Sequence, residues 1–533
     1  MRIVKLFLMT FLFLCLIHAS VFASDKSDWE GGFPDGCTSI TVGKQASADG
    51  SVMTSHTCDS HRTRSWLDIV PAQKHKPGSE YELVKRVDVD SLAMPTYGHV
   101  KTGTIKQVAY THGFVNTAYP CINDKQLAIG ESTFGGREIL KSDSGLIDCQ
   151  ALVRLMLERC TTARDAIALA DSLTKQYGWI DEGECLTIAD TKEVWHFEIV
   201  GPGEGSLGAI WAAQRVPDDQ VSVNANASRI RQVEIENSDY FMASDNLTTL
   251  AQDSGWWKPE AGPFEFCYAY NPTGRQTFSA RRREWRVLDL VAPSLGLNAN
   301  SENFPFSVKP DSLITLQKMV NLFQDYFEDT DFDMTKNITV TDDSGRTVKS
   351  PLANPFMPYD MNKMLKINGG WGWRGERPIA RWYTMYATIT QSRDWLPDEI
   401  GGVVWLALDN VASSVYVPLY CSITKVPVSY QTPGRPNGYT TQSAWWAFNR
   451  MGTLAAQRWG DMRIDVRAVW DPMQTRMFND QNTFEASVLT LHQKSPRKAI
   501  QKLTDYSNQW GETVVNRCWQ LGDFLWTKYD EKF

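Results

Sequence analysis

The stretch that decides the fold is GCTSITVGKQASADGSVMTSHTCD, residues 36 to 59. Ile40, Val42 and Val52 lie in β-prone runs, and the segment 48–50, Ala-Asp-Gly, supplies a turn between them. The pattern predicts a hairpin whose first strand begins at Cys37. Two interpretations of this cysteine follow: half of a disulfide, or a nucleophile at the edge of a strand.

Cleavage of the chain between Gly36 and Cys37 would give one residue both a thiol and an α-amine. An α-amine has a pKa of roughly 7.7–8.0, so a useful fraction is neutral near neutral pH and can accept the thiol proton. A nucleophile of this kind needs no separate catalytic histidine.

Working outward from Cys37, an ordered series of short matches resembles the start of the peptidase family C69 dipeptidases. These are N-terminal-nucleophile hydrolases, related in fold to the choloylglycine hydrolases and penicillin V acylases. The resemblance implies an α+β fold of four αββα layers with a largely helical C-terminal extension. It also implies dipeptide hydrolysis through an N-terminal cysteine and a thioester. The matching residues are Cys37-Thr38, Val42-Gly43-Lys44, Ala48-Asp49-Gly50-Ser51 and Asp59.

Further matches assign the rest of the site by position. Asn123 begins the segment NDKQL, Asn226 follows VPDDQVSV, and Arg283 ends an RRR run before Glu-Trp-Arg. The resemblance implies that Asp59 holds the amine or thiol of Cys37. Asn123 and Asn226 would donate toward the oxyanion or orient the amine, and Arg283 would give electrostatic support. Arg282 is a competitor for the last role, and an Asx turn is a second interpretation of Asn123.

Two residues are candidates for substrate binding. In many relatives an arginine stands three residues before the aspartate, whereas this chain has His56. A histidine is mostly neutral at neutral pH, so the substrate preference or the pH optimum is expected to differ. Glu131, in IGESTFGGRE, lies at a strand end where a carboxylate could meet a substrate ammonium; a solvated acid is the alternative.

The first 23 residues have a basic start, an apolar run and a final small residue, which predicts a signal peptide cut after Ala23. Residues 24–36 then form a polar propeptide. The chain is expected to be exported, to the periplasm or the medium. No later run of about 18 apolar residues predicts stable membrane insertion. A net charge of −8 without a basic cluster argues against nucleic acid as a partner.

Small peptides are therefore the expected partners, with no metal or organic cofactor implied and self-association left open.

After Cys15 of the signal is removed, nine cysteines remain, an odd number. A free Cys37 with up to four disulfides fits this number, and so do buried thiols. Two other functions are weighed: an acylase or amidase acting on N-acyl amino acids or bile-salt conjugates, and a non-catalytic glycan-binding protein that exposes some of its 20 tryptophans.

The expected organisation is a catalytic domain over 37–430 and a mainly helical region over 431–533. Apolar spacing predicts helices over 146–176, 311–328, 443–459 and much of 495–528, and a β-rich interval around 403–430. Alternation over 185–190 and 193–200 predicts a hairpin, in which His196 is a packed residue rather than a catalytic one.

Overall fold

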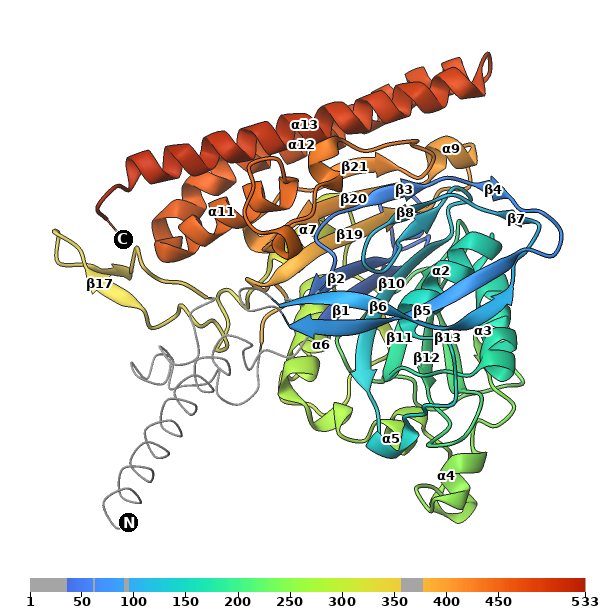
Figure 1. Ribbon diagram of the computed structural model, residues 1–533. Helices are drawn as coiled ribbons and strands as arrows, with labels where there is room; N and C mark the ends of the chain where they lie inside the picture. Colours follow the sequence, from blue (N-terminus) through green and yellow to red (C-terminus); the bar gives the residue numbers. More distant parts are fainter. Residues whose placement is uncertain (1–35, 61–62, 91–94, 356–376, 533) are drawn as a thin grey trace, which may run out of the picture.

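The computed structural model describes residues 36–60, 63–90, 95–355 and 377–532 (Figure 1). The predicted signal peptide over 1–23 and the propeptide, apart from Gly36, lie outside these residues. Within them the chain is a mixed α/β structure with two large sheets, and the strand pairings within both are antiparallel.

The first sheet is built around the opening hairpin. β1 and β2 pair with Cys37 opposite Cys58, and Gly36 lies opposite Asp59, as the strand-turn-strand pattern predicts. The seven strands run in the order β16 (Ser307–Val308), β14 (Val221–Asn224), β1 (Gly36–Val42), β2 (Ser55–Asp59), β19 (Thr384–Gln391), β20 (Val403–Leu408) and β21 (Val417–Tyr420). The hairpin thus occupies the centre of its sheet.

The second sheet has eight strands and contains the predicted hairpin of β11 and β12. Its order is β15 (Phe241–Ala243), β13 (Ile210–Val216), β12 (Val194–Val200), β11 (Gly183–Ala189), β10 (Ala128–Gly135), β9 (Ile122–Asn123), β8 (Phe114–Asn116) and β3 (Asp68–Val70). Three two-stranded ribbons complete the strands of the described residues: β5 (Glu80–Asp90) with β6 (Pro95–Lys106), β4 (Gln73–Lys74) with β7 (Tyr110–Thr111), and β17 (Thr339–Thr341) with β18 (Thr347–Lys349).

The two sheets pack face to face through β1, β2 and β10. Ser39 Oγ donates to the carbonyl of Glu131 at 2.9 Å, which joins β1 to β10. At Gly130 a Cβ would lie 2.3 Å from the carbonyl oxygen of Ser55, so only glycine permits this approach. His196 is completely buried between the sheets, 3.0 Å from Thr41 Oγ1, as expected for a packed residue.

Helices cover both outer faces. On the second sheet, α2 (Cys149–Arg159) and α3 (Ala163–Tyr177) share an apolar cluster with Ile129, Leu186 and Phe197. On the first sheet, Trp405 of β20 packs on Phe478 of the C-terminal helices, with ring centroids 4.8 Å apart. The order of layers is therefore helices, sheet, sheet, helices (Figure 1).

The C-terminal region is helical as predicted, but its longest helix was missed. α11 (Ala444–Gln457) and α13 (Pro496–Lys528) fall where apolar spacing places them, and α7 (Leu316–Gln324) lies within the predicted 311–328. α12 (Trp459–His492) lies between the two later predictions. The remaining helical segments in the part of the chain that the structure describes are η1 (Glu138–Leu140), α4 (Thr249–Asp253), η2 (Pro259–Ala261), α5 (Phe266–Tyr270), η3 (Gly274–Gln276), α6 (Phe278–Val291), η4 (Pro293–Leu295), α9 (Asp398–Gly401), η6 (Val411–Ser413), α10 (Val428–Gln431) and η7 (Arg435–Asn437).

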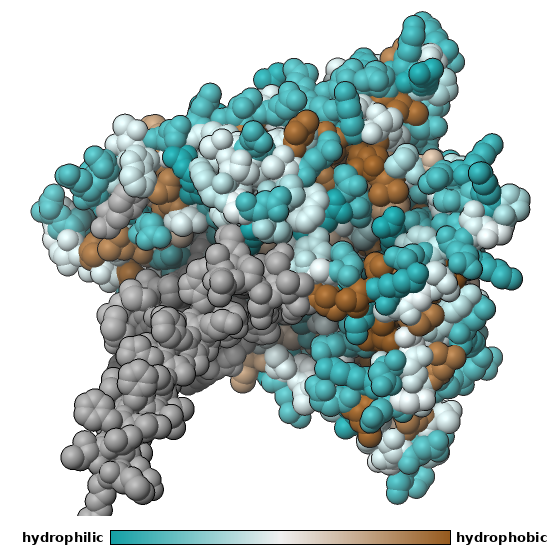
Figure 2. Space-filling view, viewed as in Figure 1, coloured by the Kyte–Doolittle hydropathy of each residue, from teal (hydrophilic) through white to brown (hydrophobic). Residues whose placement is uncertain are grey.

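Most tryptophans of the described residues are buried in the interior. Five of them are among the largest fully buried side chains, and Trp395 and Trp526 are the two that are exposed in the described ranges. The face drawn in Figure 2 is mostly hydrophilic, with hydrophobic residues in scattered groups. None of the described helices combines the length and apolar character needed to cross a membrane.

The cysteines follow the second alternative weighed from the sequence. Cys37 and seven others are buried free thiols in the structure, so they pack in the interior as thiols and not as disulfides. The seven others are Cys121, Cys149, Cys160, Cys185, Cys267, Cys421 and Cys518.

Candidate active site

Cys37 lies at the start of β1 and is held through both of its backbone polar groups. Its N–H donates to Asn226 Oδ1 at 3.0 Å, and its carbonyl accepts from Arg283 Nη1 at 2.7 Å. Asn226 follows β14, the strand next to β1, and has a left-handed φ of 63°. Asn226 and Arg283, both far from Cys37 in sequence, therefore hold its main chain in place.

The thiol of Cys37 meets two buried side chains. Its Sγ donates to Glu131 Oε2 at 3.0 Å, and His56 Nε2 lies 3.4 Å from the same sulfur. Burial, with the charge of Glu131 next in importance, raises the pKa of Cys37 well above its usual value. Thiolate formation therefore needs a nearby base or a rearrangement of this group.

Glu131 and His56 also contact each other, with Nε2 and Oε2 3.3 Å apart. Burial alone would raise the pKa of Glu131, but the hydrogen bond and charge of His56 outweigh it, and the pKa is lowered. The sequence predicts substrate contacts for both residues. The structure places both on the sulfur, which the sequence did not indicate.

Asp59 lies opposite Gly36 and is fully buried. Its Oδ1 accepts from Thr384 Oγ1 at 2.6 Å, and its Oδ2 accepts from Arg377 Nη1 at 3.0 Å. Arg377 also donates to Asn226 Oδ1 at 3.1 Å. Arg377 thus links Asp59 and Asn226, although no sequence motif identified it. The sequence offered one signal for such a residue, because a buried aspartate such as Asp59 needs a cationic partner.

Arg283, rather than Arg282, reaches Cys37. Besides the Cys37 carbonyl, it donates to Thr38 Oγ1 at 2.9 Å and to Asn226 Oδ1 at 3.0 Å. Burial, followed by the nearby charge of Arg377, lowers the pKa of Arg283. Arg282 points elsewhere, with its guanidinium 3.5 Å from the centroid of the Phe332 ring.

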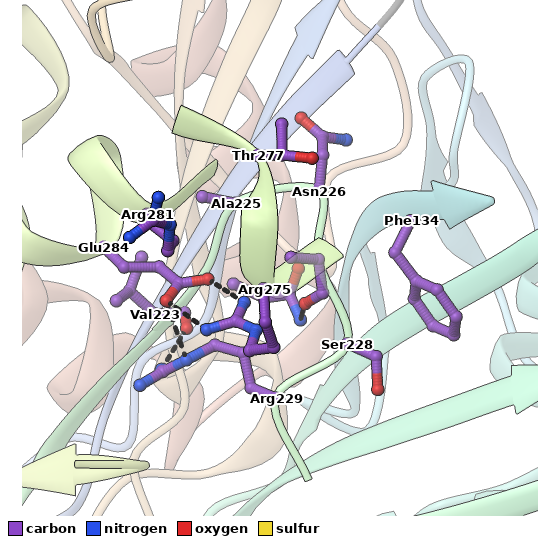
Figure 3. Close-up of polar contacts among 12 residues, drawn as sticks. Phe134, Val223, Ala225, Asn226, Ser228, Arg229, Arg275, Thr277, Arg281 and Glu284 are labelled. Atoms are coloured by element: carbon purple, nitrogen blue, oxygen red, sulfur yellow. Dashed lines mark hydrogen bonds and ion pairs between the residues drawn. The ribbon is translucent and has the colours of Figure 1, made fainter. Parts of the chain in front are cut away.

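Glu284, the residue after Arg283, holds helix α6 in place. Glu284 lies between the guanidinium groups of Arg275 and Arg229, as Figure 3 shows. Arg275 donates to both Glu284 oxygens, at 2.6 and 2.9 Å, and Glu284 is fully buried. This ion network fixes α6 beside the loop of Asn226, and so positions Arg283.

Asn123 is not brought to Cys37. Its Nδ2 donates to the carbonyls of Leu157 and Cys160 near the end of α2, at 2.8 and 2.9 Å. Its Oδ1 accepts from the N–H groups of Lys125 and Leu127, each at 3.0 Å. Both of its amide hydrogens are therefore used at the end of α2 and its oxygen is used in a turn, which corrects the prediction that it donates toward an oxyanion.

A cavity of about 380 Å³ opens beside Cys37, within the range of small-ligand sites. Its lining is mainly charged and polar. Lys85 and Arg86 come from β5, and Tyr119 from the loop before β9. The acidic lining residues include Asp148, Asp181, Glu182 and Glu184.

Comparisons with known proteins give the family of the chain. A family model described as Peptidase family C69 matches residues 36–472, a range that begins next to Cys37. "Probable dipeptidase B" of Lactococcus lactis subsp. lactis (strain IL1403) is 23% identical over 500 residues, covering 91% of this chain and 95% of the relative. "Probable dipeptidase" of Salmonella dublin is 26% identical over 397 residues, covering 72% and 80%. "Dipeptidase A" of Lactobacillus helveticus is 22% identical over 408 residues, covering 75% and 78%. The chain is a peptidase and belongs to peptidase family C69.

Proposed function

We propose that this protein is an exported dipeptidase of the N-terminal-nucleophile type, in which removal of the residues before Cys37 creates the nucleophile. The observation that carries the proposal is the placement of Cys37. Asn226 and Arg283 hold its backbone, and its side chain meets a polar cavity. The layer order of helices and sheets and the names of the relatives support the same assignment.

In the proposed reaction the free α-amine of Cys37 takes the thiol proton, and the thiolate attacks the carbonyl carbon of the peptide bond. The protonated amine then gives its proton to the leaving amine as the carbon–nitrogen bond breaks. Water hydrolyses the resulting thioester, which releases the first amino acid and restores the thiol. Asn226 Oδ1, which accepts from the Cys37 N–H, orients the amine, and Arg283 and Arg377 hold Asn226.

Amide hydrolysis of N-acyl compounds would use the same machinery. The charged lining of the cavity favours a small zwitterionic peptide over an apolar acyl chain or a steroid. A glycan-binding protein gains no support from the tryptophans, because most of those described are buried.

The test uses purified full-length chain and its Cys37→Ala variant. Intact mass gives the mature N-terminus, and a dipeptide panel gives the activity. We expect Cys37 at the N-terminus and hydrolysis that the variant lacks. Active protein that keeps residues before Cys37 would overturn the amine as base, and His56 would be the next residue to test. The cell fraction that holds the mature form tests export and the signal at 1–23.

A further inference from the structure

A buried carboxylate in the cavity wall lacks a donor for one of its oxygens. Glu184 of β11 is 2% exposed and lies directly opposite Thr133 of β10. Its Oε1 accepts from Thr133 Oγ1 at 2.9 Å. Its Oε2 is buried and receives no hydrogen bond from any donor in the described ranges. Such an oxygen is costly to bury unless a ligand supplies the missing donor.

Glu184 is connected to the nucleophile through a short chain of contacts. Thr133 Oγ1 also lies 2.9 Å from Glu131 Oε1, and Glu131 Oε2 accepts from the Cys37 thiol. Glu131 and Thr133 are two residues apart on β10, so their side chains share a face of the sheet. The unsatisfied oxygen therefore belongs to the region in which a substrate of Cys37 would lie.

The buried carboxyl groups near Glu184 would repel one another if all of them were charged. Burial, followed by the nearby charge of Glu131, raises the pKa of Glu184 well above its usual value. Burial also raises the pKa of Asp181, and it raises that of Asp148 to about 6. Glu184 consequently holds a proton beside the charged Glu131 when the cavity holds no cation. A cation placed beside them would replace that proton and relieve the repulsion.

Two cationic side chains also line the cavity. Lys85 and Arg86 of β5 are suited to a carboxylate, whereas Glu184 and Asp181 are suited to a positive group. A dipeptide carries one charge of each sign. Its α-ammonium offers three N–H donors and lies only two bonds from the carbonyl carbon that Cys37 would attack. An α-ammonium group in this position matches Glu184, a buried acid near Cys37.

We infer that Glu184 binds the α-ammonium of the substrate and so makes a free amine a requirement for hydrolysis. The inference rests on the proposed function, because it assumes that the cavity beside Cys37 is the substrate site. Binding of a protonated dipeptide displaces the proton held by Glu184, and that proton leaves to the solvent. An N-acetylated peptide lacks the cation and leaves Glu184 unsatisfied.

The experiment compares kcat/KM for dipeptides and their N-acetyl derivatives in mature wild type, Glu184→Gln and Glu260→Gln. Glu260 is an exposed acid and serves as the matched control. We expect Glu184→Gln to lower kcat/KM for free dipeptides by about 100-fold, mainly through KM, because a buried charged partner is lost. Hydrolysis of the N-acetyl peptides, however slow, should be unchanged or faster. Glu260→Gln should match wild type on both.

A second readout is proton release. The Cys37→Ala variant is titrated calorimetrically with a dipeptide in two buffers of different ionisation enthalpy, which together give the number of protons released on binding. We expect release of a proton. This release should be lost when Glu184→Gln is added to the variant. Equal losses on free and acetylated peptides, or an unchanged preference in Glu184→Gln, would overturn the role of Glu184. If no dipeptide is hydrolysed in a Cys37-dependent manner, the proposed function itself fails, which is a separate result.

Discussion

The backbone N–H of Cys37 donates a hydrogen bond of 3.0 Å to Oδ1 of Asn226, a residue 189 positions later in the chain. The same oxygen accepts from Arg283 and Arg377. One amide oxygen therefore accepts from three donors next to Cys37. This arrangement makes Asn226 the most informative residue to change.

Replacing Asn226 should cripple turnover without unfolding the protein. We expect kcat to fall by about 100- to 1,000-fold, as much as when one donor to an oxyanion is removed, because Asn226 orients the amine of Cys37. Because Asn226 has a φ of 63°, alanine adds backbone strain that glycine avoids. We expect Asn226→Gly and Asn226→Ala to lose activity alike, with Asn226→Gly closer to wild type in thermal stability. Near-normal kcat in folded Asn226→Gly would contradict the role.

Adjacent arginines provide a matched pair. Arg283→Lys removes a planar group that contacts Cys37, Thr38 and Asn226, and lysine cannot replace this geometry. We expect kcat to fall by about 100-fold or more. Arg282→Lys keeps a cation near Phe332 and should retain kcat within about threefold, since its contacts lie away from Cys37. Equal losses in the two variants would show that the RRR run acts through stability alone.

Zinc should inhibit the peptidase reversibly. Cys37 Sγ, His56 Nε2 and Glu131 Oε2 lie 3.0 to 3.4 Å from one another. Tetrahedral Zn²⁺, with bonds of about 2.3 Å to sulfur and about 2.0 Å to nitrogen or oxygen, separates its ligands by about 3.3–3.6 Å. We expect Zn²⁺, but not Mg²⁺, to block activity, and EDTA to restore it.

Alkylation identifies the site of that inhibition. Bound Zn²⁺ should slow the reaction of Cys37 with iodoacetamide, as followed by peptide mass spectrometry. In His56→Gln the protection should weaken, because one of the three ligands is lost. Protection that is undiminished in His56→Gln would mean that zinc inhibits from elsewhere.

Acid should destabilise the fold through His196. Burial, followed by the charge of Arg229, lowers the pKa of His196 to about 3, whereas an unfolded histidine has a pKa of about 6.5. Between these values the unfolded chain binds the extra proton. The contribution of His196 to stability is therefore complete above about pH 6.5 and falls by about 1.4 kcal/mol for each pH unit below it.

The measurement is the free energy of unfolding by urea at several pH values, in wild type and His196→Asn. The variant loses the contact with Thr41, which lowers stability at every pH. Its stability should fall less steeply than that of wild type between about pH 6.5 and 5. Parallel curves would show that His196 does not titrate as its burial requires. Comparing the two proteins cancels the contribution of other acids, such as Asp148.

The predicted site was strongest where local sequence carries the information. The hairpin that begins at Cys37 follows from the pattern of a short segment, whereas Asp59, Asn226 and Arg283 were assigned from the resemblance of short segments to the family. Asn123 was misassigned because an Asx turn and a donor in an active site use the same residue type in the same kind of loop. Arg377 and Glu184 could not be found, since each acquires its surroundings only when distant strands pack together.

The helix α12 illustrates the same limit for the fold. Three of its buried positions, Gln474, Gln481 and Glu485, are polar and interrupt the apolar spacing that would reveal a helix face. Their partners come from the body of the protein: Gln474 bonds with the backbone of Tyr416, and Glu485 pairs with Arg393. Only the folded structure shows that these polar residues face inward.

The dependence of Asp59 on Arg377 has a consequence for the order in which the chain is synthesised. Cys37 and Asp59 leave the ribosome early, whereas Arg377 and the strand β19, which pairs with β2, follow more than 300 residues later. At about 5–20 residues per second, this interval lasts on the order of tens of seconds. Throughout that time Asp59 lacks the cationic partner that it has in the folded protein. The cluster of polar residues around Cys37 is thus complete only when nearly three quarters of the polypeptide exists.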